Sequence, residues 1–128
     1  MRAYLAISHK DLAAFIDSKN FEVDELFAPT TQFISDNLDC DEEELEYLLS
    51  LAAGEQALEL RNSEKAPGIV LAVEVEESQI GESYEDSITL KSALRWDQIQ
   101  CALLAFQGDY ELVWFATQEI EINLGQWV

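Results

Sequence analysis

The densest group of side chains able to do chemistry is a run of carboxylates between residues 36 and 46. Seven of these eleven residues are acidic, namely Asp36, Asp39, Asp41, Glu42, Glu43, Glu44 and Glu46. Oxygen ligands of this kind bind hard cations such as calcium when a loop gathers roughly six to eight of them around one point. An EF-hand loop that began at Asp39 would need glycine and glutamate where this chain has Glu44 and Ser50. We therefore interpret the run as a solvated helix start, which the helix dipole favours, and predict no metal and no cofactor.

A second chemistry that the sequence suggests is general acid–base catalysis by paired carboxylates. Glu111, Glu119 and Glu121 stand among apolar residues around Trp114, and strand alternation would place all three on one face. Such pairs arise easily by chance in a chain with 26 Asp and Glu residues. A small carboxylate-dependent enzyme is accordingly the alternative function, and no catalytic residue is assigned.

The single histidine and the two cysteines do not indicate another kind of site. His9 follows Ser8 at an expected helix start and has no evident orienting group, so it is predicted to be a surface residue. Cys40 and Cys101 lie far apart without a CxxC pair, which predicts two reduced thiols. The chain also has no Walker, GxGxxG, GxSxG or HExxH motif.

Composition limits the classes of partner. The 128 residues carry a net charge of -19, yet 48% of them are hydrophobic, which fits a single folded domain over residues 1–128. Phosphate backbones and anionic lipids bind cationic side chains, so neither nucleic acid nor a membrane is an expected partner. A basic protein surface would be attracted instead. No signal peptide and no apolar run of about 20 residues is present, which predicts a cytoplasmic protein.

The elements expected to position these residues form an α+β fold. Strands are predicted over residues 2–7, 69–75, 87–90, 100–106 and 112–117. A short helix follows Ser8, a shorter one follows Thr30 or Thr31, and the main helix runs from about 42 to 61 behind Asp41 and Glu44. The expected architecture is a mixed or antiparallel sheet of about five strands, with one short N-terminal helix and one long central helix packed on it.

Three further stretches have weaker patterns. Residues 21–30 are predicted to be a loop with a short edge strand, because Pro29 closes a stretch rich in acids. Residues 76–86 are predicted to be an acidic loop around Gly81. The tail from 119 to 124 alternates apolar and polar residues as a strand does.

Residues 100–106 fit a helix by composition and a strand by their position before Gln107-Gly108-Asp109. The strongly β-like stretch 112–117 on the far side favours strand, turn, strand. Gly108 would then occupy the first central position of a two-residue type II′ turn.

Four stretches together carry a resemblance to a known family. They are Met1-Arg2-Ala3-Tyr4-Leu5, Asp41-Glu42-Glu43-Glu44-Leu45-Glu46-Tyr47, Trp96-Asp97-Gln98-Ile99 and Glu111-Leu112-Val113-Trp114-Phe115-Ala116-Thr117-Gln118-Glu119-Ile120. With them the chain resembles, over nearly its full length, an uncharacterised family of small acidic proteins from actinomycete-type bacteria, a domain of unknown function. None of the four is a known catalytic signature. The resemblance therefore assigns no functional residue, although it favours a strand over 100–106.

The long helix has two apolar faces. One is formed by Leu45, Leu49, Ala53, Ala57 and Leu60 and is expected to meet the sheet. At about 100° per residue, Tyr47, Leu51 and Leu58 project from roughly the opposite side. Burying a leucine contributes about 1.5–3 kcal/mol, so we expect these three side chains to be covered. The cover would be the first helix through Phe15, the segment 21–27, a partner, or a second copy of the chain.

The sequence thus predicts an acidic globular domain that acts as a non-catalytic binding or regulatory module and engages another protein. The partner would be a basic protein, or a second copy in a homodimer. The residues expected to make this contact are Glu43, Glu44, Glu46, Tyr47, Leu51 and Leu58.

Overall fold

The computed structural model describes residues 1–109 and 111–128. The strands are β1 (Arg2–Ile7), β2 (Asn20–Phe21), β3 (Leu26–Phe27), β4 (Gly68–Glu74), β5 (Ile80–Ser83), β6 (Ser87–Leu90), β7 (Leu94–Arg95), β8 (Ile99–Ala105) and β9 (Val113–Ala116). The α-helices are α1 (His9–Ser18), α2 (Thr31–Asp36), α3 (Glu42–Glu59) and α4 (Thr117–Asn123). Three 3-10 turns are η1 (Glu77–Gln79), η2 (Trp96–Gln98) and η3 (Leu124–Gln126).

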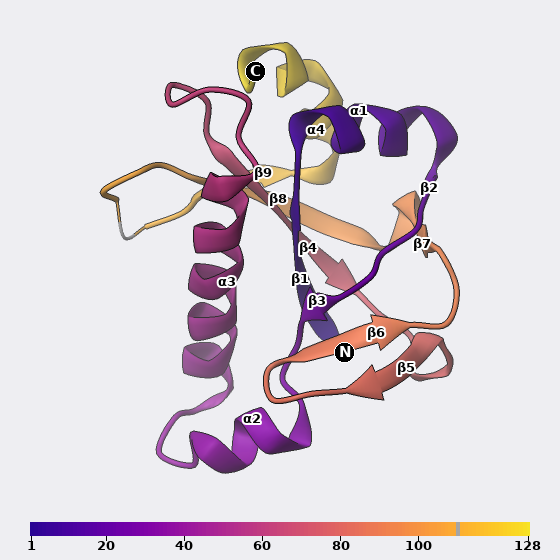
Figure 1. Ribbon diagram of the computed structural model, residues 1–128, viewed down its shortest axis with the longest axis vertical. Helices are drawn as coiled ribbons and strands as arrows, with labels where there is room; N and C mark the ends of the chain where they lie inside the picture. Colours follow the sequence, from indigo (N-terminus) through magenta and orange to yellow (C-terminus); the bar gives the residue numbers. More distant parts are fainter. Residues whose placement is uncertain (110) are drawn as a thin grey trace.

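The main sheet has the strand order β5-β6-β3-β1-β4-β8-β9, and its neighbouring strands pair antiparallel (Figure 1). A separate two-stranded sheet joins β2 to β7. The α+β prediction is confirmed. The prediction of about five strands is too low, because the short segments β3 and β5 join the main sheet and bring it to seven.

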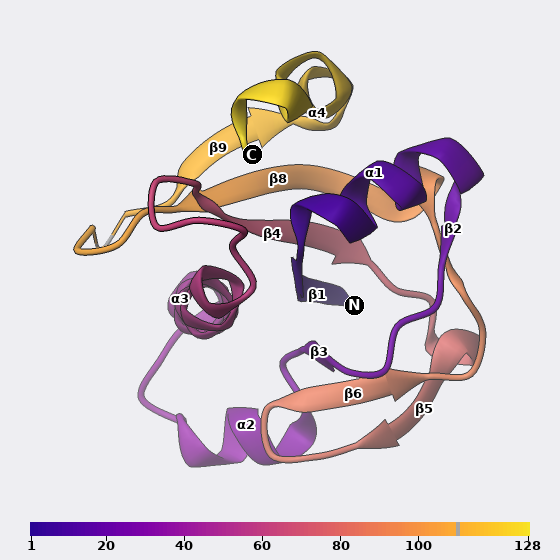
Figure 2. The same cartoon turned by 45° about the horizontal axis from the view of Figure 1, so that its top comes forward.

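Alternation along β1 divides the core between the two faces of the sheet. Ala3, Leu5 and Ile7 point into a large apolar cluster that includes residues of α1 and α4. Tyr4, on the other face, packs with Leu49, Ala53 and Ala57 of α3. Figure 2 shows α1 and α4 on one side of β4 and β8 and α3 on the other. The sheet is therefore covered on both faces, and α3 packs on its side along β1, β4 and β8, with Phe33 of α2 against the same cluster.

The helix starts follow the capping chemistry predicted from sequence. Ser8 Oγ accepts a hydrogen bond from the Asp11 amide at 3.1 Å, and Thr30 caps α2. At the start of α3, the Asp41 carboxylate accepts from the Glu44 amide at 2.9 Å, and the Glu44 carboxylate accepts from the Asp41 amide at 3.3 Å. This is the predicted capping box, and the long helix is confirmed with its end at Glu59.

Two predicted loops contain strands. In the stretch 21–30, β3 lies inside the main sheet between β1 and β6, so the edge-strand prediction is wrong. Leu26 explains the position, because its side chain is buried in the core. In the stretch 76–86, η1 leads into β5, which pairs with β6. The exposed Glu82 of β5 fits an edge strand with one solvated face.

The tail 119–124 is helical, so the strand prediction there is wrong. The carboxylate of Glu119 accepts a hydrogen bond from the Ala116 amide at 2.9 Å and thereby caps the start of α4. Ile120 is fully buried, whereas Ile122 is 80% exposed. Residues two positions apart share one face of a strand but lie on roughly opposite sides of a helix, so the different environments of these two isoleucines fit a helix.

The strand prediction for 100–106 is confirmed, because β8 pairs antiparallel with β9 from Cys101 opposite Ala116 to Leu104 opposite Val113. The prediction of a two-residue turn is wrong, since residues 105–112 separate the last paired positions, Leu104 and Val113. The Asp109 amide donates to the Phe106 carbonyl oxygen at 3.1 Å. In this turn Gly108 stands at the third position, and its φ of +89° is the conformation for which a type II turn needs glycine there.

Candidate functional site: a groove between α3 and β9

The outer flank of α3 carries the side chains that the sequence analysis selected. Tyr47 is 50% exposed, and Leu51 and Leu58 are partly exposed. Glu43 and Glu44 are exposed, and Glu46 is half-buried. Leu60, which was assigned to the buried face, follows the end of the helix and is exposed.

The segments expected to cover this flank lie elsewhere. Phe15 is fully buried among aromatic rings on the far side of the sheet, stacked on Phe21 and edge-on to Trp96. Phe27 packs beside the sheet-facing side of α3. The connection between β8 and β9 approaches the flank instead, because the position of a Cβ on Gly54 would lie 3.3 Å from Leu112 Cδ2.

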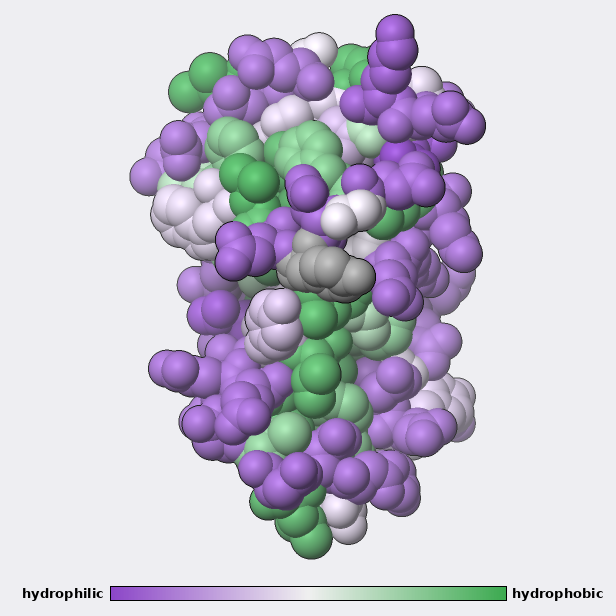
Figure 3. All heavy atoms as spheres, turned by 90° about the vertical axis from the view of Figure 1, so that its left-hand side faces the viewer, coloured by the Kyte–Doolittle hydropathy of each residue, from purple (hydrophilic) through white to green (hydrophobic). Residues whose placement is uncertain are grey.

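Leu112 separates two hollows that we call together the α3–β9 groove. The first has a volume of about 240 Å³ and lies between Leu51 and Leu58 of α3 and Ala105 and Phe106. The second has a volume of about 360 Å³, with Tyr47 and Ser50 on one side and Leu103 and Glu111 on the other. Figure 3 looks onto this side of the molecule and shows a run of apolar surface with hydrophilic residues on both sides.

Carboxylates border the groove. Glu55 and Asp109 line the first hollow and Glu111 the second, and all three are exposed. Over residues 1–109 and 111–128, the ion pairs join the N-terminus to Glu74 and Arg95 to Glu76 and Asp97, and none involves these three. The groove is thus apolar inside and negatively charged at its border.

Trp114 extends the apolar surface at the sheet edge. Its side chain is 60% exposed, and in the β8–β9 ladder it lies opposite Leu103. Trp114, Leu103 and Leu112 were not among the contact residues selected from the sequence. The aromatic and leucine side chains were visible in the sequence, but the position of β9 at the sheet edge depends on long-range pairing.

The titratable groups beneath the groove are held in their neutral forms. Burial raises the pKa of Tyr4 to about 12, with the charge of Glu46 as the next cause. Burial also raises the pKa of the Cys101 thiol, although a hydrogen bond from Trp114 acts in the opposite direction. A thiol in this state is a poor nucleophile at neutral pH. Cys101 and Cys40 are both free.

The carboxylates considered for catalysis do not meet on one face. Glu119 and Glu121 are two positions apart in α4, and the Glu119 carboxylate is engaged by the Ala116 amide. Glu111 lies before β9. His9, which was expected at the surface, is half-buried, and its Nε2–H donates to the Leu124 carbonyl oxygen at 2.9 Å, joining α1 to η3.

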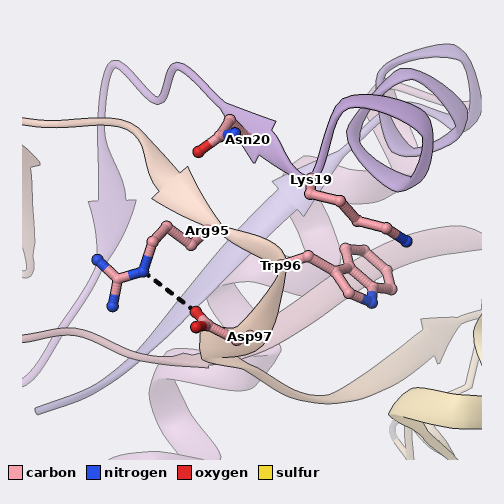
Figure 4. A pocket seen from close by; sticks show the side chains of 5 residues that line it. All are labelled: Lys19, Asn20, Arg95, Trp96 and Asp97. Carbon is pink, nitrogen blue, oxygen red and sulfur yellow. Dashed lines mark hydrogen bonds and ion pairs between the residues drawn. The ribbon is translucent and has the colours of Figure 1, made fainter.

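A separate hollow of about 350 Å³, outside the α3–β9 groove, was not foreseen from the sequence and lies beside Lys19, Asn20, Arg95, Trp96 and Asp97 (Figure 4). Lys19 Nζ lies 5.5 Å from the centre of a Trp96 ring. The Arg95 guanidinium is paired with Asp97 at 3.2 Å and with Glu76 at 2.8 Å. Because its arginine is already neutralised, this hollow is a weaker candidate for binding than the α3–β9 groove.

Within residues 1–109 and 111–128, no group of three or more His, Cys, Asp or Glu side chains is placed to hold a metal ion. None of the helices in this part of the chain is both long enough and apolar enough to cross a membrane.

The fold and the groove define an acidic α+β domain with an open apolar groove on one face of its sheet. The chain belongs to DUF6912, a family of unknown function whose model matches residues 1–107. The match confirms the predicted relationship to an uncharacterised domain family. It contains the stretches 1–5, 41–47 and 96–99 that carried the resemblance, and it ends before 111–120. Comparisons with curated proteins and with solved structures find no significant match.

Proposed function

We propose that this protein is a non-catalytic binding or regulatory module that engages another protein through the α3–β9 groove. The observation that carries the proposal is the exposure of Trp114 and Tyr47, at 60% and 50%, on the two sides of Leu103: Trp114 lies opposite Leu103 in the ladder, and Tyr47 lines the second hollow with it. Aromatic side chains exposed next to an apolar hollow are typical of surfaces that bind other proteins.

The charge of the chain supports a basic partner. With a net charge of -19, the protein attracts cationic surfaces and repels a second copy of itself. Glu43, Glu44 and Glu46 add carboxylates at the N-terminal end of α3, on the helix that forms one wall of the groove. A homodimer would bring these groups close to the same groups of the other copy. The two free thiols favour a reducing compartment, and we place the interaction in the cytoplasm.

The test is capture of partners from the native host, with the full chain as bait at about 50 mM and about 500 mM salt. We expect a basic protein to be retained at low salt and released at high salt. The bait variant Glu43→Lys/Glu46→Lys should lose it, whereas Glu82→Lys on β5, far along the sheet order from β9, should keep it. Identical capture by all three baits at both salt concentrations would contradict the proposal.

A further inference from the structure

The sheet has room for another helix beside α3. α3 lies over β1 and β4 and reaches β8, while β9 follows β8 at the sheet edge. Neighbouring strands are about 4.8 Å apart, so β9 lies about 10 Å from β4. Packed helix axes are also about 8–10 Å apart. On this face of the sheet, the area above β8 and β9 therefore matches the position of a second helix lying beside α3.

The described part of the chain does not fill this position with a helix of its own. α1 and α4 lie on the opposite face of the sheet, as Figure 2 shows. α2 lies at the other end of the sheet order, where its cap residue Thr30 donates to the Glu85 carbonyl oxygen at 2.8 Å beside β6. None of the helices in residues 1–109 and 111–128 therefore occupies the groove.

The two hollows have a spacing that suits one helix. They follow each other along α3, at Tyr47 and Ser50 and then from Leu51 to Leu58. With a rise of 1.5 Å per residue, their centres are about 9 Å apart along the helix. Side chains at positions i and i+4 of a helix are about 6 Å apart along its axis, and those at i and i+7 about 10.5 Å. Two apolar side chains on one face of a bound helix can therefore occupy both hollows.

A partner strand fits this edge less well. Strand addition uses the free backbone groups of an edge strand such as β9. The Ala116 amide at the end of β9 is already bonded to the Glu119 carboxylate at 2.9 Å. β9 has four residues, so this bond removes one of few donors and protects the edge.

The border charges specify the polar face of the occupant. Glu55, Asp109 and Glu111 are exposed around the hollows, and no described cation forms an ion pair with them. Lysine or arginine side chains along the edges of a bound helix would reach these carboxylates. A second copy of this chain would place carboxylates there.

We infer that the α3–β9 groove binds a basic amphipathic helix of a partner protein, with two apolar side chains in the two hollows and cationic side chains opposite Glu55, Asp109 and Glu111. This inference rests on the proposed function and specifies the chemistry of its partner. In helix-in-groove recognition of this kind, apolar residues at positions i, i+4 and i+7 of the bound helix contact the groove.

The probe is a synthetic peptide of about 14 residues, built from leucine and lysine with the leucines on one helical face. The control peptide has the same composition in an order that gives no apolar face. Affinity is measured by fluorescence anisotropy, and the bound surface is mapped by amide chemical shifts of the full chain. We expect the amphipathic peptide to bind at least about tenfold more tightly than the control, with shifts in α3 and β9.

Variants of the full chain locate the site. Leu51→Asp and Trp114→Ala should each weaken binding of the amphipathic peptide by about tenfold or more. Ile122→Asp is the matched control, because Ile122 is 80% exposed on α4 at the other face of the sheet, and it should leave the affinity unchanged. Circular dichroism of each variant establishes that it is folded, and Trp114→Ala keeps the test decisive if Leu51→Asp unfolds.

Equal affinity for the two peptides, or unchanged binding by folded Trp114→Ala, would overturn the helix inference. A dimer in sedimentation experiments that Leu51→Asp or Trp114→Ala dissociates would also overturn it, since the groove would then be occupied by a second copy. If a salt-sensitive host partner is captured while the peptide test fails, the binding function stands and only the helix inference falls.

Discussion

Gln79 and Gln98 form two hydrogen bonds to each other in the interior, with the Nε2 of each side chain donating to the Oε1 of the other. Each Oε1 also accepts the amide that precedes its own 3-10 turn, from Glu76 at 3.0 Å and from Arg95 at 2.9 Å. Nε2 of Gln98 donates to the Glu74 carbonyl oxygen at 3.0 Å. This network joins η1 to η2 and thereby fixes the starts of β5 and β8, the strand that forms part of the groove.

We expect Gln98→Ala to destabilise the protein by about 2 kcal/mol or more. The substitution removes the acceptor of the Arg95 amide and the side-chain donor to the Glu74 carbonyl, and it takes two of the hydrogen bonds of Gln79. Each buried group left unsatisfied costs about 1–3 kcal/mol. Urea unfolding measures the change. Gln100→Ala, at an exposed position of β8, should stay within about 0.5 kcal/mol of the unsubstituted protein. Equal losses in the two variants would show that the network does not stabilise the fold.

The same substitution at two glycines should have different effects. A Cβ on Gly68 would lie 2.8 Å from backbone atoms of Ala57 and Leu58, so Gly68→Ala must push α3 away from β4. Overpacking of this kind costs about 1–3 kcal/mol. A Cβ on Gly54 would meet only side chains, at 3.3 Å and 3.5 Å, and helix propensity would gain about 1 kcal/mol. Thermal unfolding should therefore show a large loss for Gly68→Ala and a small change for Gly54→Ala, and the reverse order would contradict the close approach of α3 and β4.

Features set by local chemistry were predictable from the sequence. The capping box of Asp41 and Glu44 lies within one turn, and both of its hydrogen bonds are present. The outward flank of α3 followed from about 100° per residue, and Tyr47 is exposed there. The strand prediction for the tail was wrong because Ile120 and Ile122 alternate with polar residues, as in a strand. The hydrogen bond that Glu119 accepts instead caps a helix, in which Ile120 is buried and Ile122 is exposed.

The groove itself was only half predictable. One wall comes from α3, whose periodicity identified Leu51 and Leu58. The other side needs β9 at the sheet edge and Leu112 beside Gly54, and both depend on pairings between residues far apart in the chain. Short strands such as β3 carry too few residues for a period-2 pattern, so the sheet order could not be deduced from sequence.

Charge reversal at the two ends of α3 should separate the effect of the helix dipole on stability from the effect of the net charge. The last turn of α3 has no basic residue and ends in Glu59, while Glu42 stands in the first turn. Glu59→Lys and Glu42→Lys change the net charge equally, but a cation is favourable only at the C-terminal end. We expect Glu59→Lys to be the more stable variant by about 0.5–1 kcal/mol at low salt. Urea unfolding should show that difference shrinking at about 0.5 M salt, and a difference of opposite sign would contradict the dipole argument.

Ionisation of Tyr4 should destabilise the protein at alkaline pH. Burial, followed by the charge of Glu46, raises the pKa of Tyr4 from 10.0 to about 12. The folded state therefore keeps the phenol proton over a pH range in which the unfolded state loses it. The stability that this proton contributes is complete below pH 10 and is lost as the pH rises towards about 12. The unsubstituted protein should thus lose more unfolding free energy than Tyr4→Phe between about pH 9 and about pH 11. Chemical unfolding of both proteins measures this, and the difference in their absorbance at about 295 nm follows ionisation of Tyr4 itself, since tyrosinate absorbs there. A parallel loss in both proteins, or ionisation of Tyr4 near pH 10, would mean that the phenol is not buried as the structure places it.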